Sequence, residues 1–326
     1  MDSSPTFQFL VEALERPWHI IAPDWRGYGA SEWLDRPYWF PDYYADLDVL
    51  LDHFSPDRPA TLVGHSMGAN IAATYAAVRP QRVARLAMLD FLGLRPPPEV
   101  DAPMQLVQWM DAVVARPQVR PYADAAALAR RLRAVNPRLS EDQADFLSRA
   151  VSRPRPDGQI EMACDPWHRV HGPSLYHIED SLAAWRKIQV PVLLLIADRG
   201  FVDERMGDDP TELERRIGCF RNRQVVTVAD SGHNVQHDQP VQVAGHPPHA
   251  HINVPSRCIW EGMLVGIGEQ LAQDDTEFDG RVLVALDPFG GHAQEHALFA
   301  LCLTGAHRRS DQCGNPLGVN LLLMPL

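Results

Sequence analysis

A serine lies between two glycines where a strand-like segment passes into a helix-like one, in "ATLVGHSMGANIAATYAAV". Gly64, His65, Ser66, Met67 and Gly68 form a Gly-x-Ser-x-Gly pattern, in which the glycines make room for a tight strand-to-helix turn. A serine hydroxyl is a weak nucleophile at neutral pH, so it needs a base, a group that orients the base, and donors for an oxyanion. We therefore predict that Ser66 is a nucleophile and that the Met67 N–H, at the start of the helix, is one oxyanion donor.

The base is expected to be a histidine on a loop that follows a late strand. His233 stands five residues after the strand-like "VVTV", within "ADSGHNVQHDQP". The small residues before it leave the loop free to project the imidazole. His237 is the rival candidate, and we expect it to be a solvated neighbour. His233 is therefore the predicted general base.

Two carboxylates compete for the role of orienting this base. Asp198 ends the strand-like "LLLIAD" and Asp90 ends "LAMLD". Both precede His233, so either keeps the chain order serine, acid, histidine. Asp198 is favoured, Asp90 is the alternative and Asp203 is a third candidate. A strand-end carboxylate can equally cap a backbone turn, which leaves the choice open.

The surrounding segments alternate between apolar strands and amphipathic helices. Strands are predicted over residues 18–24, 60–66, 83–90, 190–198 and 223–230, and helices over 6–15, 41–54 and 67–79. Nearly continuous apolar strands separated by helices are typical of a mostly parallel sheet covered on both faces. The predicted fold class is therefore α/β.

The alternation of predicted strands and helices stops after residue 90 and resumes at residue 190. We predict a helical insertion over residues 91–189 without strands, including a capping box at Ser140 and Gln143. Large side chains in the insertion are candidates for lining a pocket or for helix packing: Trp109, Met110, Trp167, Tyr176 and Trp185. Residues 1–90 and 190–240 would form the core. Residues 241–326, rich in His, Gly and Pro, would form an atypical tail.

Composition limits the classes of partner. The 326 residues carry a formal net charge of −12, which disfavours a nucleic-acid partner. No run approaches the ~20 apolar residues that span a bilayer, and the N-terminus does not resemble a secretory signal. The five cysteines are scattered without a CxxC pair, and the tail histidines His246, His249 and His251 lack a completing ligand. We therefore expect a cytoplasmic protein with a small-molecule substrate and no metal or cofactor; the oligomeric state stays open.

Taken together, "APDWRGYGASE" (22–32), "GHSMGA" (64–69), the strand-end carboxylates and "SGHNVQHDQP" (231–240) resemble the α/β-hydrolase fold family over about residues 1–240. The resemblance implies a Ser-Asp-His triad and a mobile helical cap over an apolar pocket. Members that act on haloalkanes or epoxides carry a carboxylate at the position of Ser66, so these chemistries are not expected. The implied reaction is hydrolysis of a small apolar ester, thioester, lactone or activated C–C substrate through an acyl-enzyme.

The resemblance also bears on the choice of acid. In the family the acid follows either of two strands. "LDFLGLRP", which begins with Leu89 and Asp90, looks like the motif of members with the acid at the earlier strand. "ADRGFVDE", around Asp198, departs by one residue from the usual spacing at the later strand.

The sequence departs from the family at both ends. Members usually carry His-Gly and an apolar residue before the "DS" that opens this chain, and this segment supplies the second oxyanion N–H. A strand that precedes it would lie between residues 18–24 and 60–66. The tail leaves the family pattern near residue 243, as a disordered or frameshifted segment would. The alternative expectation is therefore a catalytically defective or truncated relative. If the chain as written is instead stable, "GRVLVALDP" (280–288) is expected to fill the vacant place.

Overall fold

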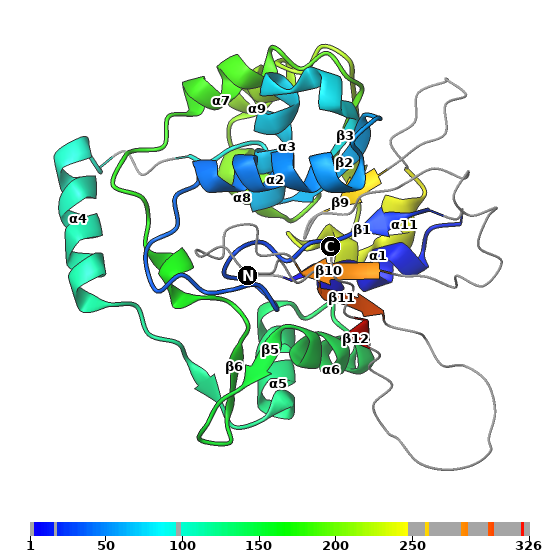
Figure 1. Ribbon diagram of the computed structural model, residues 1–326. Coiled ribbons are helices and arrows are strands. Elements are labelled where there is room, and N and C mark those ends of the chain that lie inside the picture. The colour runs from blue at the N-terminus through cyan, green and yellow to red at the C-terminus, as the bar shows by residue number, and fades with distance from the viewer. Residues whose placement is uncertain are drawn as a thin grey trace.

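The computed structural model describes residues 3–15, 18–95 and 99–246, together with four short strands farther along the chain. The main sheet has nine strands in the order β12-β11-β10-β1-β9-β2-β3-β7-β8. All strands from β10 through β8 in this order pair in parallel, and β11 and β12 are antiparallel additions at one edge. The predicted α/β class with a mostly parallel sheet is confirmed (Figure 1).

The predicted strands and helices of the core are present, but the strand predicted over 18–24 has only two residues and the helix predicted over 6–15 is divided into two short helices. The core strands are β1 (Ile20–Ile21), β2 (Ala60–His65), β3 (Val83–Leu89), β7 (Val192–Ala197) and β8 (Arg223–Val228). The helices are η1 (Ser4–Phe7), α1 (Gln8–Glu12), α2 (Pro41–Phe54), α3 (Met67–Val78), η2 (Pro80–Arg82), α8 (Phe201–Met206), α9 (Pro210–Ile217), α10 (Val235–Asp238) and α11 (Pro240–Ala244).

Helices cover both faces of the sheet (Figure 1). Successive strand residues point to opposite faces, so Leu62 of β2 packs in one apolar cluster with α2 and α3, whereas Val63 packs in another with α1 and α11. All six residues of β2 are buried. This two-sided burial explains why the strand reads as a continuous apolar run.

A strand from the tail lies where the sequence predicted a vacancy. β9 (Cys258–Trp260) pairs in parallel with both β1 and β2, and Ile259 lies opposite Ile21 and Leu62. The backbone groups that an absent central strand would leave open are therefore paired by β9. The expectation that "GRVLVALDP" takes this place is wrong, because β10 (Val282–Ala285) pairs with β1 on its other side.

The edge of the sheet is built from two further tail strands, β11 (Phe299–Cys302) and β12 (Leu321–Leu322). The rest of the tail beyond residue 246 lies outside the described residues, and with it the expectation of disorder there and the histidines His249 and His251.

The segment between β3 and β7 is mainly helical, but it is not free of strands as predicted. Its helices are α4 (Ala102–Ala115), α5 (Ala125–Val135), α6 (Glu141–Ala150), η3 (Pro166–Arg169) and α7 (Ile178–Trp185). Three short strands, β4 (Pro121–Tyr122), β5 (Ser152–Pro154) and β6 (Ile160–Met162), form an antiparallel sheet. They are too short and too polar for alternation to reveal them. The predicted capping box at Ser140 and Gln143 is confirmed.

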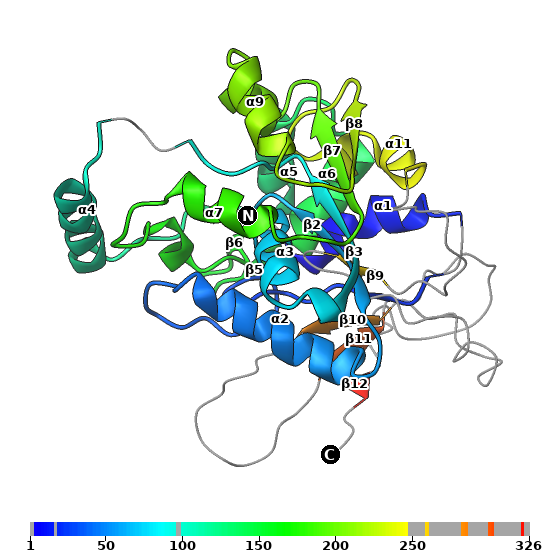
Figure 2. The same cartoon turned by 90° about the horizontal axis from the view of Figure 1, so that it is seen from above.

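The helices of this segment differ in how they are held. α5 and α6 pack on each other, and Phe9 of α1 joins their apolar cluster around Leu147. α4 buries none of its residues and stands apart from the body of the molecule in both views (Figures 1 and 2).

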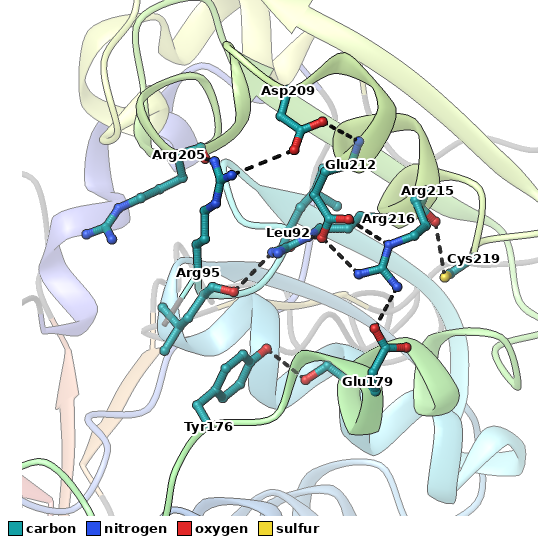
Figure 3. Close-up of polar contacts among 12 residues, drawn as sticks. Leu92, Arg95, Tyr176, Glu179, Arg205, Asp209, Glu212, Arg215, Arg216 and Cys219 are labelled. Atoms are coloured by element: carbon teal, nitrogen blue, oxygen red, sulfur yellow. Dashed lines mark hydrogen bonds and ion pairs between the residues drawn. The ribbon is translucent and has the colours of Figure 1, made fainter. Parts of the chain in front are cut away.

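Both ends of the segment are tied to α9 by arginines. Arg216 is 2% exposed; it donates to the carbonyl oxygens of Leu92 at 2.8 Å and Leu94 at 3.2 Å, just after β3. Its neighbour Arg215 pairs with Glu179 of α7 at 2.7 Å, just before the chain returns to β7. Figure 3 shows the two guanidinium groups directed toward these partners. One helix therefore anchors the departure and the return of the segment.

Candidate active site

Ser66 occupies a strained turn between β2 and α3. Its backbone has φ 53° and ψ −115°, in the left-handed region that L-residues rarely adopt. Such a conformation costs about 1–3 kcal/mol and persists only where the surroundings hold it. A Cβ on Gly64 would collide with the backbone of Gly68, so the first glycine of the pattern is required by space. Met67 is the first residue of α3, where helix N–H groups have no intrahelical partner.

His233 lies between Ser66 and Asp90. Its Nε2 is 2.9 Å from Ser66 Oγ and its Nδ1 is 2.9 Å from Asp90 Oδ2. A carboxylate can only accept, so Nδ1 carries the proton and Nε2 is free to accept from the serine hydroxyl. The His233 side chain is 33% exposed and that of Asp90 is fully buried. The imidazole is thus partly accessible from outside, whereas the carboxylate is not.

The buried Asp90 carboxylate is held by backbone donors from the end of β7 and the start of α8. Oδ1 accepts from the Ala197 N–H at 3.1 Å, and Oδ2 accepts from the Phe201 N–H at 2.6 Å as well as from His233. These hydrogen bonds offset the cost of burying the charge. Gly200 is part of this cradle, because a Cβ there would collide with Asp90 Oδ2.

Asp198, favoured from the sequence, is not the partner of His233. Its Oδ1 accepts from the Ser231 N–H and its Oδ2 from the Asp230 N–H, both at 2.9 Å. These backbone hydrogen bonds hold the pKa of the Asp198 carboxyl below its usual value. The preference for Asp198 is corrected by this geometry, because its side chain turns toward the loop after β8. Asp198 therefore shapes the loop that carries His233.

Two other sequence candidates also lie away from the imidazole's partners. Asp203 is an exposed residue of α8. His237, expected to be solvated, is 5% exposed, and its Nε2 lies 2.9 Å from the Thr6 carbonyl oxygen. The carbonyl oxygen only accepts, so His237 donates to it and links α10 to the N-terminal turn. Most residues next to His237 in the sequence are polar, so its burial could not be predicted from the sequence.

A phenylalanine beside the imidazole was not among the predicted pocket residues. The Phe201 ring centroid is 5.3 Å from that of His233, and Phe91 stacks beside Phe201 at 6.0 Å. Trp185 is instead fully buried and stacks on Phe220, as helix packing requires. In the sequence, the one signal near Phe201 was Gly200, a residue type that allows a close approach of backbone to a neighbouring group.

Of the remaining candidates, Trp167 is buried, Met110 is 54% exposed, and Tyr176 bonds Ser181 at 2.8 Å. They contribute to packing or to the surface of the insertion. Within the described ranges, no group of three or more His, Cys, Asp or Glu side chains is arranged to hold a metal ion. In the same ranges, no helix has the length and apolar character needed to cross a membrane.

Similarity to known proteins agrees with this geometry. The model of the alpha/beta hydrolase fold matches residues 2–240. A serine hydrolase-like protein of Danio rerio is 30% identical over 210 residues, which cover 61% of this chain and 63% of that protein. A serine hydrolase-like protein of Dictyostelium discoideum is 28% identical over 247 residues, covering 72% and 67%. This chain therefore spans a little under two thirds of the length of the zebrafish relative.

A solved structure extends the likeness to three dimensions. The thioesterase domain from the curacin biosynthetic pathway superposes with a TM-score of 0.62 and 27% identity, covering 75% of this chain and 86% of that domain. With the family model matching residues 2–240, the chain belongs to the α/β-hydrolase fold family.

Proposed function

We propose that this protein is a serine hydrolase that works through an acyl-enzyme on Ser66. The observation that carries the proposal is the continuous chain of hydrogen bonds from Ser66 through His233 to the buried Asp90. Relatives described as serine hydrolase-like support the same general activity.

In the proposed mechanism each group has its own step. As Ser66 Oγ attacks the substrate carbonyl carbon, His233 Nε2 takes its proton and later gives it to the leaving group. A water molecule deprotonated by the same nitrogen then hydrolyses the acyl-enzyme. Asp90 keeps Nδ1 protonated and stabilises the imidazolium without itself taking the proton. The Met67 N–H stabilises the oxyanion.

For the substrate, we propose a small apolar ester or thioester. The Phe201 ring, which lies beside the imidazole and stacks on Phe91, favours an apolar acyl or aryl group. The structural likeness to a thioesterase domain supports inclusion of thioesters. Lactones and activated C–C substrates share the same acyl-enzyme chemistry and belong to the same test panel.

We further propose that residues 91–189 act as a cap over the site. Asn136 donates to Asp238 Oδ1 at 2.6 Å, and Arg138 lies 3.7 Å from Asp230, so the insertion contacts the loop on either side of His233. Asn136→Ala should raise KM for longer esters more than for acetate esters. If Asn136→Ala leaves KM at the parent value for the longer esters as well as for the acetate esters, this role is excluded.

The decisive experiment is active-site labelling with a fluorophosphonate, followed by a p-nitrophenyl ester and acyl-thioester panel. Ser66→Ala should abolish labelling and lower turnover more than about a thousandfold. Ser55→Ala is the control, because it removes the hydroxyl of a buried serine whose Oγ donates to the Arg58 carbonyl at 2.8 Å. Folded parent protein that resists labelling would instead favour a catalytically defective relative.

A further inference from the structure

The residue before the nucleophile reaches the backbone of the base. The His65 side chain is 6% exposed, and its Nε2 lies 2.7 Å from the carbonyl oxygen of His233. On the other side of the ring, Nδ1 lies 3.4 Å from Nε2 of the fully buried Gln236. His65 thus lies between the chain that presents Ser66 and the loop that presents the base.

The partners determine where the His65 proton resides. The carbonyl oxygen of His233 can only accept, so His65 Nε2 must donate. In the neutral ring Nδ1 then keeps its lone pair, which accepts from the Gln236 amide. Gln236 therefore favours the tautomer that the bond to His233 requires, as outer partners do for other functional imidazoles.

The sheet order explains why such a link is needed. Ser66 follows β2 and His233 follows β8, and β3 and β7 lie between these strands. The base must therefore reach the nucleophile across two strands, on a loop that contains Ser231 and Gly232. A displacement of about 1 Å between reacting groups can cost roughly a hundredfold in rate.

We propose that His65 is a positioning residue that fixes His233 relative to Ser66, and that Gln236 supports it by holding its tautomer. The inference rests on the proposed function of Ser66 and His233. The His65 and His233 ring centroids are 4.5 Å apart. A neutral His65 also avoids repulsion when His233 becomes an imidazolium during turnover.

The kinetic test compares His65→Leu with His65→Gln, whose amide nitrogen can replace Nε2 as a donor. His65→Leu should lower kcat about a hundredfold and leave KM within about twofold, because the acyl-binding surface is unchanged. The kcat of His65→Gln should be at least about tenfold higher than that of His65→Leu. Gln236→Leu should lower kcat less than His65→Leu, since it removes only the longer bond.

His237→Leu is the matched control, because His237 is also a buried histidine that donates to a carbonyl oxygen, that of Thr6. It should lower the melting temperature about as much as His65→Leu but change kcat by less than about threefold. A parent-like kcat in His65→Leu, or a loss in His65→Gln as large as in His65→Leu, would overturn the proposal.

A second measurement does not depend on activity. In the ¹⁵N spectrum of the parent protein with labelled histidine, His65 should appear as the Nε2–H tautomer at neutral pH, and Gln236→Leu should mix the two tautomers. An Nδ1–H tautomer in the parent would overturn the proposal even if the His65 variants fail to fold. If the tautomer is as expected but the parent shows no labelling of Ser66, the proposed function has failed and the local hydrogen bonding has not.

Discussion

Two neighbouring strands of the sheet, β3 and β7, each end in an aspartate, and the two carboxylates do different work. Asp90 after β3 is fully buried and meets the His233 imidazole. Asp198 after β7 is partly exposed and meets the N–H groups of Asp230 and Ser231. Asp90 contacts the ring of the proposed base, and Asp198 holds the loop that carries it.

The difference follows from the local backbone. Asp90 has φ 47°, a left-handed conformation that Asp tolerates better than most residues, and this kink directs its side chain toward the imidazole. The backbone donors that surround it come from the last residue of β7 and the first residue of α8. A strand-end aspartate thus marks the active edge of the sheet, but the groups that face it decide its role.

The largest effect is expected for Asp90→Asn. An amide cannot both accept from Nδ1–H and stabilise the imidazolium, so the wrong tautomer of His233 is favoured and kcat should fall by about 10⁴. Ester hydrolysis under saturating substrate measures this, with circular dichroism to confirm the fold. A decrease of less than tenfold would assign the orienting role elsewhere.

Gly200→Ala should have the next largest effect. Its new Cβ would collide with Asp90 Oδ2 and push the carboxylate away from His233, so kcat should fall about a hundredfold. Gly172→Ala is the matched control, because a Cβ at Gly172 meets no atom within 4 Å. Similar kcat values for the two variants would show that the cradle around Asp90 adapts.

Asp198→Asn should act mainly on the fold. The Asn side chain offers one carbonyl oxygen for two backbone N–H groups, so one charge-assisted hydrogen bond is lost and unfolding free energy should fall by about 1–2 kcal/mol. Turnover should fall by at most about tenfold. Urea denaturation and kcat measured on the same preparations separate the two effects, and a loss as large as that of Asp90→Asn would reverse the assignment.

The smallest effect is expected for the pH dependence of the difference in stability between the parent and Asp198→Asn. Folding lowers the pKa of Asp198, so its ionised form stabilises the protein above the unfolded pKa, and this contribution is lost as pH falls through the folded pKa. The difference in melting temperature between parent and Asp198→Asn should therefore shrink below about pH 4. Melting curves at pH 7, 4 and 3.5 test this, and a constant difference would show that ionisation of Asp198 is irrelevant.

Features set by short stretches of chain could be read from the sequence. Ser66 was identifiable because the crowding that demands Gly64 arises within five residues. The helix over 41–54 and the apolar strands were identifiable because burial on one or both faces imposes a period on the sequence. His233 could be predicted as the partner of Ser66 because chain order and the loop after a strand narrow the choice among the histidines.

Features set by contacts between distant segments were decided only by the tertiary structure. The choice of Asp90 over Asp198 depends on N–H groups more than a hundred residues from Asp90 in the chain. The burial of His237 depends on the carbonyl of Thr6. The place of β9 depends on which segment pairs with two open strand edges. Local sequence constrains backbone conformation and periodicity, whereas long-range pairing selects among chemically equivalent side chains and strands, and only the folded chain brings those partners together.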